Sequence, residues 1–137
     1  MFKDTNYFDS DISDWDVSSV TNMNRMFEGV SNFSADISDW DVSSVTDMSY
    51  MFRDSNDFNG DISDWDVSSV TTVFEMFYGA ESFNGDISDW DVSSVTDMNK
   101  MFYGADGLSD DNKCAIHTSF SSNGNWPYNW EGSCSDD

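Results

Sequence analysis

An 11-residue segment, Asp-Ile-Ser-Asp-Trp-Asp-Val-Ser-Ser-Val-Thr, occurs four times without change, and each copy begins 25 residues after the one before it. The copies begin at Asp11, Asp36, Asp61 and Asp86. A fixed period between about 20 and 50 residues is typical of chains whose units bury their apolar side chains only against neighbouring units. The repeat therefore predicts one elongated domain of stacked units over residues 1–108, followed by a capping segment, residues 109–137, that closes the stack.

The pattern within one unit predicts a strand followed by a short helix. Trp40, Asp41 and Val42 alternate between apolar and polar, which is typical of a strand with one buried face. Ser44 and Asp47 then have the spacing of the capping pair at a helix start. One apolar helical stripe would be formed by Val45, Met48, Met51 and Phe52. We therefore expect an α/β solenoid, a right-handed coil similar to a leucine-rich repeat, with one short parallel β-strand and one short helix or 3₁₀ turn per unit.

Equivalent aromatic side chains return once per unit and predict the core. One expected column is formed by Phe8, Phe33, Phe58 and Phe83, and another by Trp15, Trp40, Trp65 and Trp90. Aromatic residues make up 16% of the chain and recur at fixed offsets, which excludes a disordered chain.

The charge of the chain excludes two classes of partner. The sequence has 27 acidic and 5 basic residues, and its formal net charge is -22. Such a chain repels the phosphates of nucleic acids and of anionic lipids, so we expect no nucleic-acid partner. It also contains no run of about 18 apolar residues, so we expect no direct insertion into a membrane.

The two cysteines, Cys114 and Cys134, both lie in the capping segment. A disulfide between them would close a loop of about 20 residues and stabilise the cap by about 3 kcal/mol. Such a bond favours an oxidising, extracytoplasmic location. Two free thiols with a structural role are the alternative.

Residues 83–102, FNGDISDWDVSSVTDMNKMF, resemble the 25-residue repeat of the BspA-like leucine-rich repeat surface proteins. That family is found in mycoplasma lipoproteins and in surface proteins of marine bacteria. The resemblance covers residues 1 to about 108, and the segment after Leu108 is similar to the cap that follows such repeats. It implies a secreted or cell-surface, non-enzymatic protein used in adhesion or protein recognition. The chain departs from the pattern at Val73, where the other units have Met, and at Phe74, where a polar residue is usual.

Aspartates at three positions of each unit would form columns of carboxylates if the units stack in register. Neighbouring carboxylates about 5 Å apart repel each other by roughly 1 kcal/mol in water, so something should relieve the repulsion. Turns in which the carboxylate accepts backbone N–H bonds are one arrangement, a bound divalent cation such as Ca²⁺ is another, and diffuse counter-ions are a third. The candidate calcium ligands are Asp36, Asp39, Asp41, Asp61, Asp64 and Asp66. We expect no other cofactor.

The positions that differ between units are free of the stacking constraint and are where a recognition surface can form. They include four aromatic residues, Tyr50, Phe74, Tyr78 and Tyr103, and four of the five basic residues, Lys3, Arg25, Arg53 and Lys100. One interpretation is an exposed aromatic patch that binds a protein or another surface ligand, because aromatic side chains are common interface anchors. The other is that the rings lie flat over the loops and cover the core.

Nothing in the sequence indicates an enzyme. The only histidine is His117, which we expect to pack or bond locally within a capping helix over about residues 109–118. No nucleotide-binding loop or Cys/His metal set is present.

The other end of the stack has no counterpart of the cap. We expect Phe8, Ile12 and Trp15 to be poorly covered there, and self-association through the N-terminal unit. Two function classes follow from the sequence. One is a secreted or cell-surface module for recognition or adhesion, and the other is a structural stalk or spacer, in one version stabilised by calcium.

Overall fold

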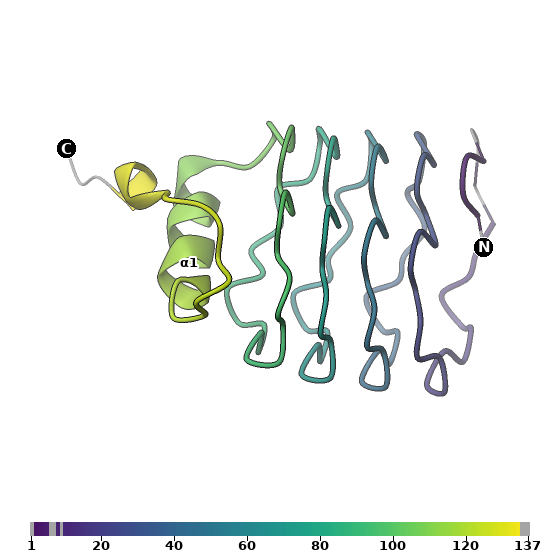
Figure 1. Ribbon diagram of the computed structural model, residues 1–137. Coiled ribbons are helices and arrows are strands. Elements are labelled where there is room, and N and C mark those ends of the chain that lie inside the picture. The colour runs from purple at the N-terminus through teal and green to yellow at the C-terminus, as the bar shows by residue number, and fades with distance from the viewer. Residues whose placement is uncertain (1, 6–7, 9, 135–137) are drawn as a thin grey trace.

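The computed structural model describes residues 2–5, 8 and 10–134, so Met1 of the predicted repeat lies outside the described residues. The 25-residue units lie side by side as successive loops of the chain, and the capping segment packs against the last of them (Figure 1). The helices lie in the capping segment, where α1 spans Asp110–Phe120 and the 3₁₀ helix η1 spans Glu131–Cys134. Within the described part of the chain, neither helix has the length and apolar content needed to cross a bilayer.

The predicted α/β solenoid is wrong, and with it the similarity to a leucine-rich repeat fold. No sheet forms among the described residues. Strand-type pairing is limited to isolated parallel bridges, which join Asn22 to Asp47, Asp47 to Thr72, and Thr72 to Asp97. The predicted strand around Asp41 is cut short because its carboxylate accepts the N–H of Ser43, which folds the backbone into a turn.

The predicted helix in each unit is also wrong, because one residue in its middle takes a left-handed conformation. Tyr50 has φ 59, and Arg25, Glu75 and Lys100 at the equivalent positions have φ 60, 51 and 55. A left-handed residue cannot continue a right-handed helix. The segment instead forms successive tight turns, in which the N–H of Met51 donates to the carbonyl of Met48 at 3.2 Å.

Two sets of backbone hydrogen bonds hold neighbouring units in register. In the first, N–H groups donate to the following unit, from Arg25 to the carbonyl of Ser49 at 3.0 Å and from Phe27 to that of Met51 at 2.9 Å. In the second, threonines donate to the preceding unit, from Thr46 to Thr21, Thr71 to Thr46 and Thr96 to Thr71, each at 2.8 Å. Equivalent residues therefore lie next to each other, as the repeat predicts.

The core is a continuous stack of aromatic rings. The centroids of Phe27 and Phe52 are 5.8 Å apart, and those of Phe52 and Phe77 are 5.7 Å apart, with the rings nearly parallel. Buried tryptophans add a bond between units, in which Nε1 donates to an isoleucine carbonyl of the preceding unit. These bonds run from Trp40 to Ile12 at 3.0 Å, from Trp65 to Ile37 at 3.1 Å and from Trp90 to Ile62 at 3.0 Å.

The N-terminal unit is better covered than the sequence suggested. Phe8 and Ile12 are buried, so the prediction that they are poorly covered is wrong. Phe2 packs against Phe8 with a centroid distance of 4.5 Å, which explains the difference. Trp15 is 43% exposed, as predicted.

The cap closes the other end and confirms the predicted helix and disulfide. Ser109 is the N-cap of α1 and accepts the N–H of Asn112 at 3.2 Å, and the helix buries Ile116 and Phe120. Cys114 and Cys134 form a disulfide. Because the chain supplies no fifth unit, the hydroxyl of Tyr128 accepts the N–H of Phe102 at 3.0 Å in place of a carbonyl.

The bond from Trp65 to Ile37 can be tested by Trp65→Phe. We expect this change to lower the free energy of unfolding by about 1–2 kcal/mol, since it removes a buried hydrogen bond and some packed volume. Trp15→Phe is the matched control, because the half-exposed Trp15 makes no such bond within the described residues, and it should cost less than about 0.5 kcal/mol. Urea unfolding measures both, and equal losses would contradict the role given to the bond.

Candidate functional site

Many of the aspartates that recur along the stack accept hydrogen bonds from a nearby serine. Oδ1 of Asp61 accepts the backbone N–H of Ser63 at 3.0 Å and its hydroxyl at 2.6 Å. The side-chain bond, followed by the backbone bond, lowers the pKa of Asp61 from its ordinary value. The same turn, with the same lowering of the aspartate pKa, occurs at Asp11, Asp16, Asp36, Asp41, Asp66 and Asp91.

The structure does not bring the candidate calcium ligands together. All six are exposed, and four of them, Asp36, Asp41, Asp61 and Asp66, accept hydrogen bonds from the serine two residues later, an arrangement that we call the aspartate–serine turn. Within residues 2–5, 8 and 10–134, no group of three His, Cys, Asp or Glu side chains is placed to hold a metal ion. Of the three arrangements considered for the aspartate columns, the hydrogen bonds therefore support the turns.

The hydrogen bond between Ser63 and Asp61 predicts a change in titration. Folding lowers the pKa of Asp61 below 3.8, so the bond contributes stability above about pH 4 and loses it as the pH falls through the folded-state pKa. Ser63→Ala should raise the pKa of Asp61 toward its ordinary value, as measured by NMR of the side-chain carboxyl. Ser69→Ala, at a neighbouring exposed serine outside the turn, should leave that pKa unchanged. A shift of equal size in both variants would contradict this assignment.

The four predicted aromatic residues lie together with two arginines, and we call this set the arginine–aromatic surface. It consists of Arg25, Tyr50, Arg53, Phe74, Tyr78 and Tyr103. The guanidinium carbon of Arg25 lies 3.9 Å from the ring centroid of Tyr50, and that of Arg53 lies 4.8 Å from the centroid of Tyr78. Tyr50 meets Phe74 edge to face at 5.3 Å, and Tyr78 stacks on Tyr103 at 5.1 Å.

Exposure differs along the arginine–aromatic surface. Tyr103 is 58% exposed, whereas Tyr50, Phe74 and Tyr78 are half-buried. The interpretation as a cover over the core therefore fits the three half-buried rings, which partly cover the units. The interpretation as an exposed binding residue fits Tyr103, whose side chain projects into solvent. Left-handed, non-glycine residues such as Tyr50 cost free energy, and such positions often cluster at functional sites.

Two buried glutamates form ion pairs with the arginines of this surface. Glu28 and Glu75 are only 7% and 8% exposed. Glu28 accepts hydrogen bonds from Arg25 at 3.0 and 2.8 Å, and these bonds raise the pKa of the arginine above its ordinary value. Arg53 lies 3.5 Å from Glu75 and 3.9 Å from Glu28, so it is shared between two carboxylates of different units.

The four aromatic residues could be predicted from the sequence, but the packing of the two arginines against their rings was missed. The signal was present, since Arg25 and Tyr50 are 25 residues apart, as are Arg53 and Tyr78. Units that stack in register bring such pairs into contact, and an arginine over a tyrosine ring is a favourable interaction.

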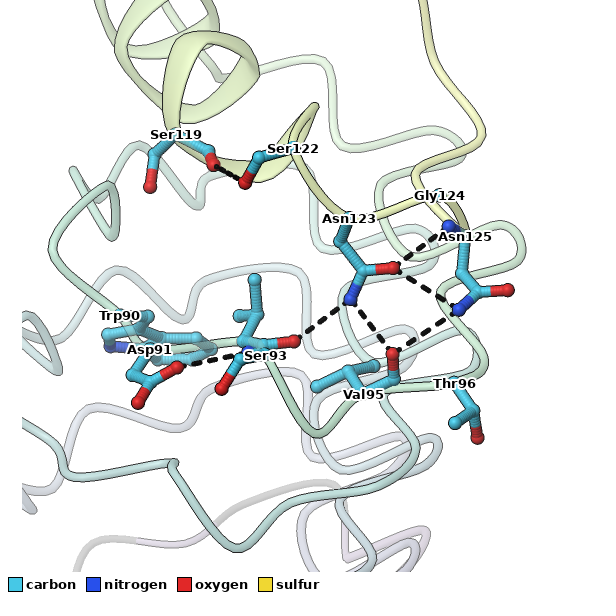
Figure 2. Close-up of a pocket in the computed structure, with 11 residues that line it drawn as sticks. Trp90, Asp91, Ser93, Val95, Thr96, Ser119, Ser122, Asn123, Gly124 and Asn125 are labelled. Atoms are coloured by element: carbon cyan, nitrogen blue, oxygen red, sulfur yellow. Dashed lines mark hydrogen bonds between the residues drawn. The ribbon is translucent and has the colours of Figure 1, made fainter.

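A second site is an open cavity of about 530 Å³ between the last unit and the cap, which we call the cap groove (Figure 2). It is lined by residues 90–93, 95 and 96 of the unit and by residues 119 and 122–125 of the cap. His117 does not line it. Its Nδ1 accepts Nε1–H of Trp126 at 3.0 Å and the backbone N–H of Trp130 at 3.4 Å, so the predicted local bonding is confirmed.

Arg53→Met tests whether the arginine–aromatic surface is held by its buried ion pairs. The change leaves Glu75 without its cation, so we expect the free energy of unfolding to fall by about 1–2 kcal/mol. Lys100→Met is the matched control, because this exposed lysine makes no ion pair within the described residues and should have little effect. Guanidinium unfolding compares the two. Adding Glu75→Gln to Arg53→Met should recover part of the loss, and a further loss instead would contradict the pairing.

The family model described as "Mycoplasma protein of unknown function, DUF285" matches residues 1–114. No curated protein and no solved structure matches the chain.

Proposed function

The chain belongs to the DUF285 family, and on that premise we propose that it is a non-enzymatic module that recognises a protein or another surface ligand through the arginine–aromatic surface. The resemblance of its repeat to the BspA-like surface proteins supports the same proposal. We further propose that the module is secreted or displayed at a cell surface. The disulfide between Cys114 and Cys134 supports this location, because such bonds persist in oxidising compartments.

The observation that carries the proposal is the exposure of Tyr103 at the end of a ring stack. Its ring rests on Tyr78, which in turn lies under Arg53. An exposed tyrosine held in place by its neighbours offers a large apolar area and a polar tip at a low cost in conformational entropy. Tyrosine and arginine are also the residue types that dominate binding energy at protein interfaces.

Charge supports the same surface as the binding region. The chain carries a net charge of -22, and its uniform aspartate columns would repel an acidic partner surface. The basic side chains Lys3, Arg25 and Arg53 form ion pairs with Asp4, Glu28, Asp54 and Glu75, so positive and negative groups are close to balance on this side of the stack. A partner therefore meets less repulsion here than at the aspartate columns.

The alternative function is a structural stalk or spacer. The uniform aspartate–serine turns and the backbone bonds between units favour this class, since neither depends on the side chains that vary. A spacer has no saturable ligand and tolerates loss of a unit, whereas a recognition module has a ligand whose affinity depends on particular rings. The two are therefore separable by measurement.

Tyr103→Ser provides that measurement. Binding of the labelled protein to cultured animal cells and to immobilised extracellular-matrix proteins is titrated to saturation. We expect Tyr103→Ser to weaken binding about tenfold while leaving the melting temperature nearly unchanged, because the side chain is mostly exposed.

Trp15→Ser is the control, because it removes the other exposed large aromatic residue of the described chain from a different region. This variant should retain the affinity. If no surface binds saturably, or if the two variants lose affinity equally, the spacer is the better account.

A further inference from the structure

Every junction between full units uses the same donors. At the junction between the second and third units, Nε1 of Trp65 donates to the carbonyl of Ile37 at 3.1 Å. The N–H and the hydroxyl of Thr71 both donate to the carbonyl of Thr46, at 2.8 and 3.2 Å. The other junctions repeat these bonds with Trp40 and Thr46 and with Trp90 and Thr96. Each unit therefore binds the unit before it through one tryptophan and one threonine.

The first unit, residues 11–35, presents the same donors in the same register. The ring of Trp15 stacks on that of Trp40 with a centroid distance of 6.5 Å and an interplanar angle of 6°, and Trp65 stacks on Trp90 at 6.4 Å and 6°. Thr21 is exposed, and its carbonyl accepts the N–H of Thr46. Among the described residues, no acceptor receives Nε1 of Trp15 or the N–H and hydroxyl of Thr21.

The same edge also presents acceptors. In the second unit, the carbonyls of Asp47 and Ser49 accept N–H groups of the preceding unit at 2.9 and 3.0 Å. The equivalent carbonyls of the first unit belong to Asn22 and Asn24, and no donor from the described residues reaches them. The described residues before position 10 pair with carbonyls further along this edge. We call the open part, formed by Trp15, Thr21, Asn22 and Asn24, the first-unit face.

The opposite end of the stack is closed by the cap (Figure 1). The N–H of Phe102, whose equivalents donate to the following unit, donates to the hydroxyl of Tyr128 at 3.0 Å. Nδ2 of Asn123 donates to the carbonyls of Val92 and Val95, each at 2.9 Å. A second molecule therefore cannot stack on this end without displacing the cap, which excludes a head-to-tail assembly.

We propose that two copies of this chain associate through their first-unit faces, related by a two-fold axis. The face carries both donors and acceptors, so Trp15 and Thr21 of one copy face Asn22 and Asn24 of the other, and the reverse. Such a self-complementary surface is what a two-fold interface requires. The 43% exposed ring of Trp15 adds apolar area to the contact. Because both outer ends carry a cap, the assembly stops at two copies.

Charge opposes this association and predicts its salt dependence. Residues 10–24 contain Asp11, Asp14 and Asp16 and no basic residue, and each copy has a net charge of -22. Two copies therefore repel each other, and dissolved salt screens the repulsion between exposed charges. We expect dimerisation to strengthen as the salt concentration rises, in contrast to a contact held by ion pairs.

The test is sedimentation equilibrium of the full chain over a wide range of protein concentrations, at low and high salt. The mass should rise with concentration from 15.5 kDa to twice that value and no further. Hydrogen exchange identifies the face. The amide of Thr21 should exchange more slowly as the dimer forms, whereas the amides of Thr46 and Thr71, which are bonded within one copy, should be protected at every concentration.

Two pairs of variants separate the contact from folding. Trp15→Phe and Thr21→Val each remove a donor from the first-unit face and should weaken dimerisation about tenfold, because each change occurs twice across a two-fold interface. Trp65→Phe and Thr71→Val remove the same donors from an internal junction. These two should lower the stability of the fold and leave the dimerisation constant unchanged.

Several results would overturn the proposal. A monomer at every concentration would point to a different protein chain as the occupant of this face. Exchange at Thr21 that does not depend on concentration would place the contact elsewhere on the molecule. Growth beyond two copies would contradict the closure by the cap, and equal weakening in both pairs of variants would remove the role given to Trp15 and Thr21.

Discussion

Hydrogen bonds between equivalent backbone groups of neighbouring units determine the arrangement of almost every other group in this protein. A single 25-residue unit has no regular helix or strand within the described chain and cannot bury its apolar side chains alone. The bonds to the units on either side fix its register, as in the series from Thr96 to Thr71 to Thr46. Once register is fixed, phenylalanines must stack on phenylalanines and aspartates must follow aspartates, so the core and the acidic face have the same cause.

The sequence was sufficient for the stacking, the aromatic core and the capping helix, but it misled on the structure inside a unit. Val45, Met48, Met51 and Phe52 have helical spacing, yet a series of tight turns buries the same residues. The deciding feature is the left-handed conformation at Tyr50. Such conformations usually require glycine, and the bulky residue gave no sign of it. Contacts with the neighbouring units override the local preference.

The candidate sites were predictable to different degrees. The four rings could be grouped from the sequence because positions that differ between units are recognisable by comparison alone. The carboxylates could not be assigned, since an aspartate two residues before a serine suits both a turn and a cation ligand. Only the bonds from Ser63 to Asp61 and their equivalents separate these alternatives. The cap groove could not be found at all, because it depends on how far Asn123 reaches across the last unit.

The same backbone bonds explain how a recognition surface can vary without loss of the fold. Arg25, Tyr50 and Glu75 occupy equivalent positions and differ in size and charge. Their N–H groups nevertheless donate to the following unit at 3.0, 2.9 and 3.1 Å. Because the register is carried by main-chain atoms, side chains at these positions contribute little to it. Substitution there can therefore change what the surface binds, while the invariant segment between them keeps each unit in place.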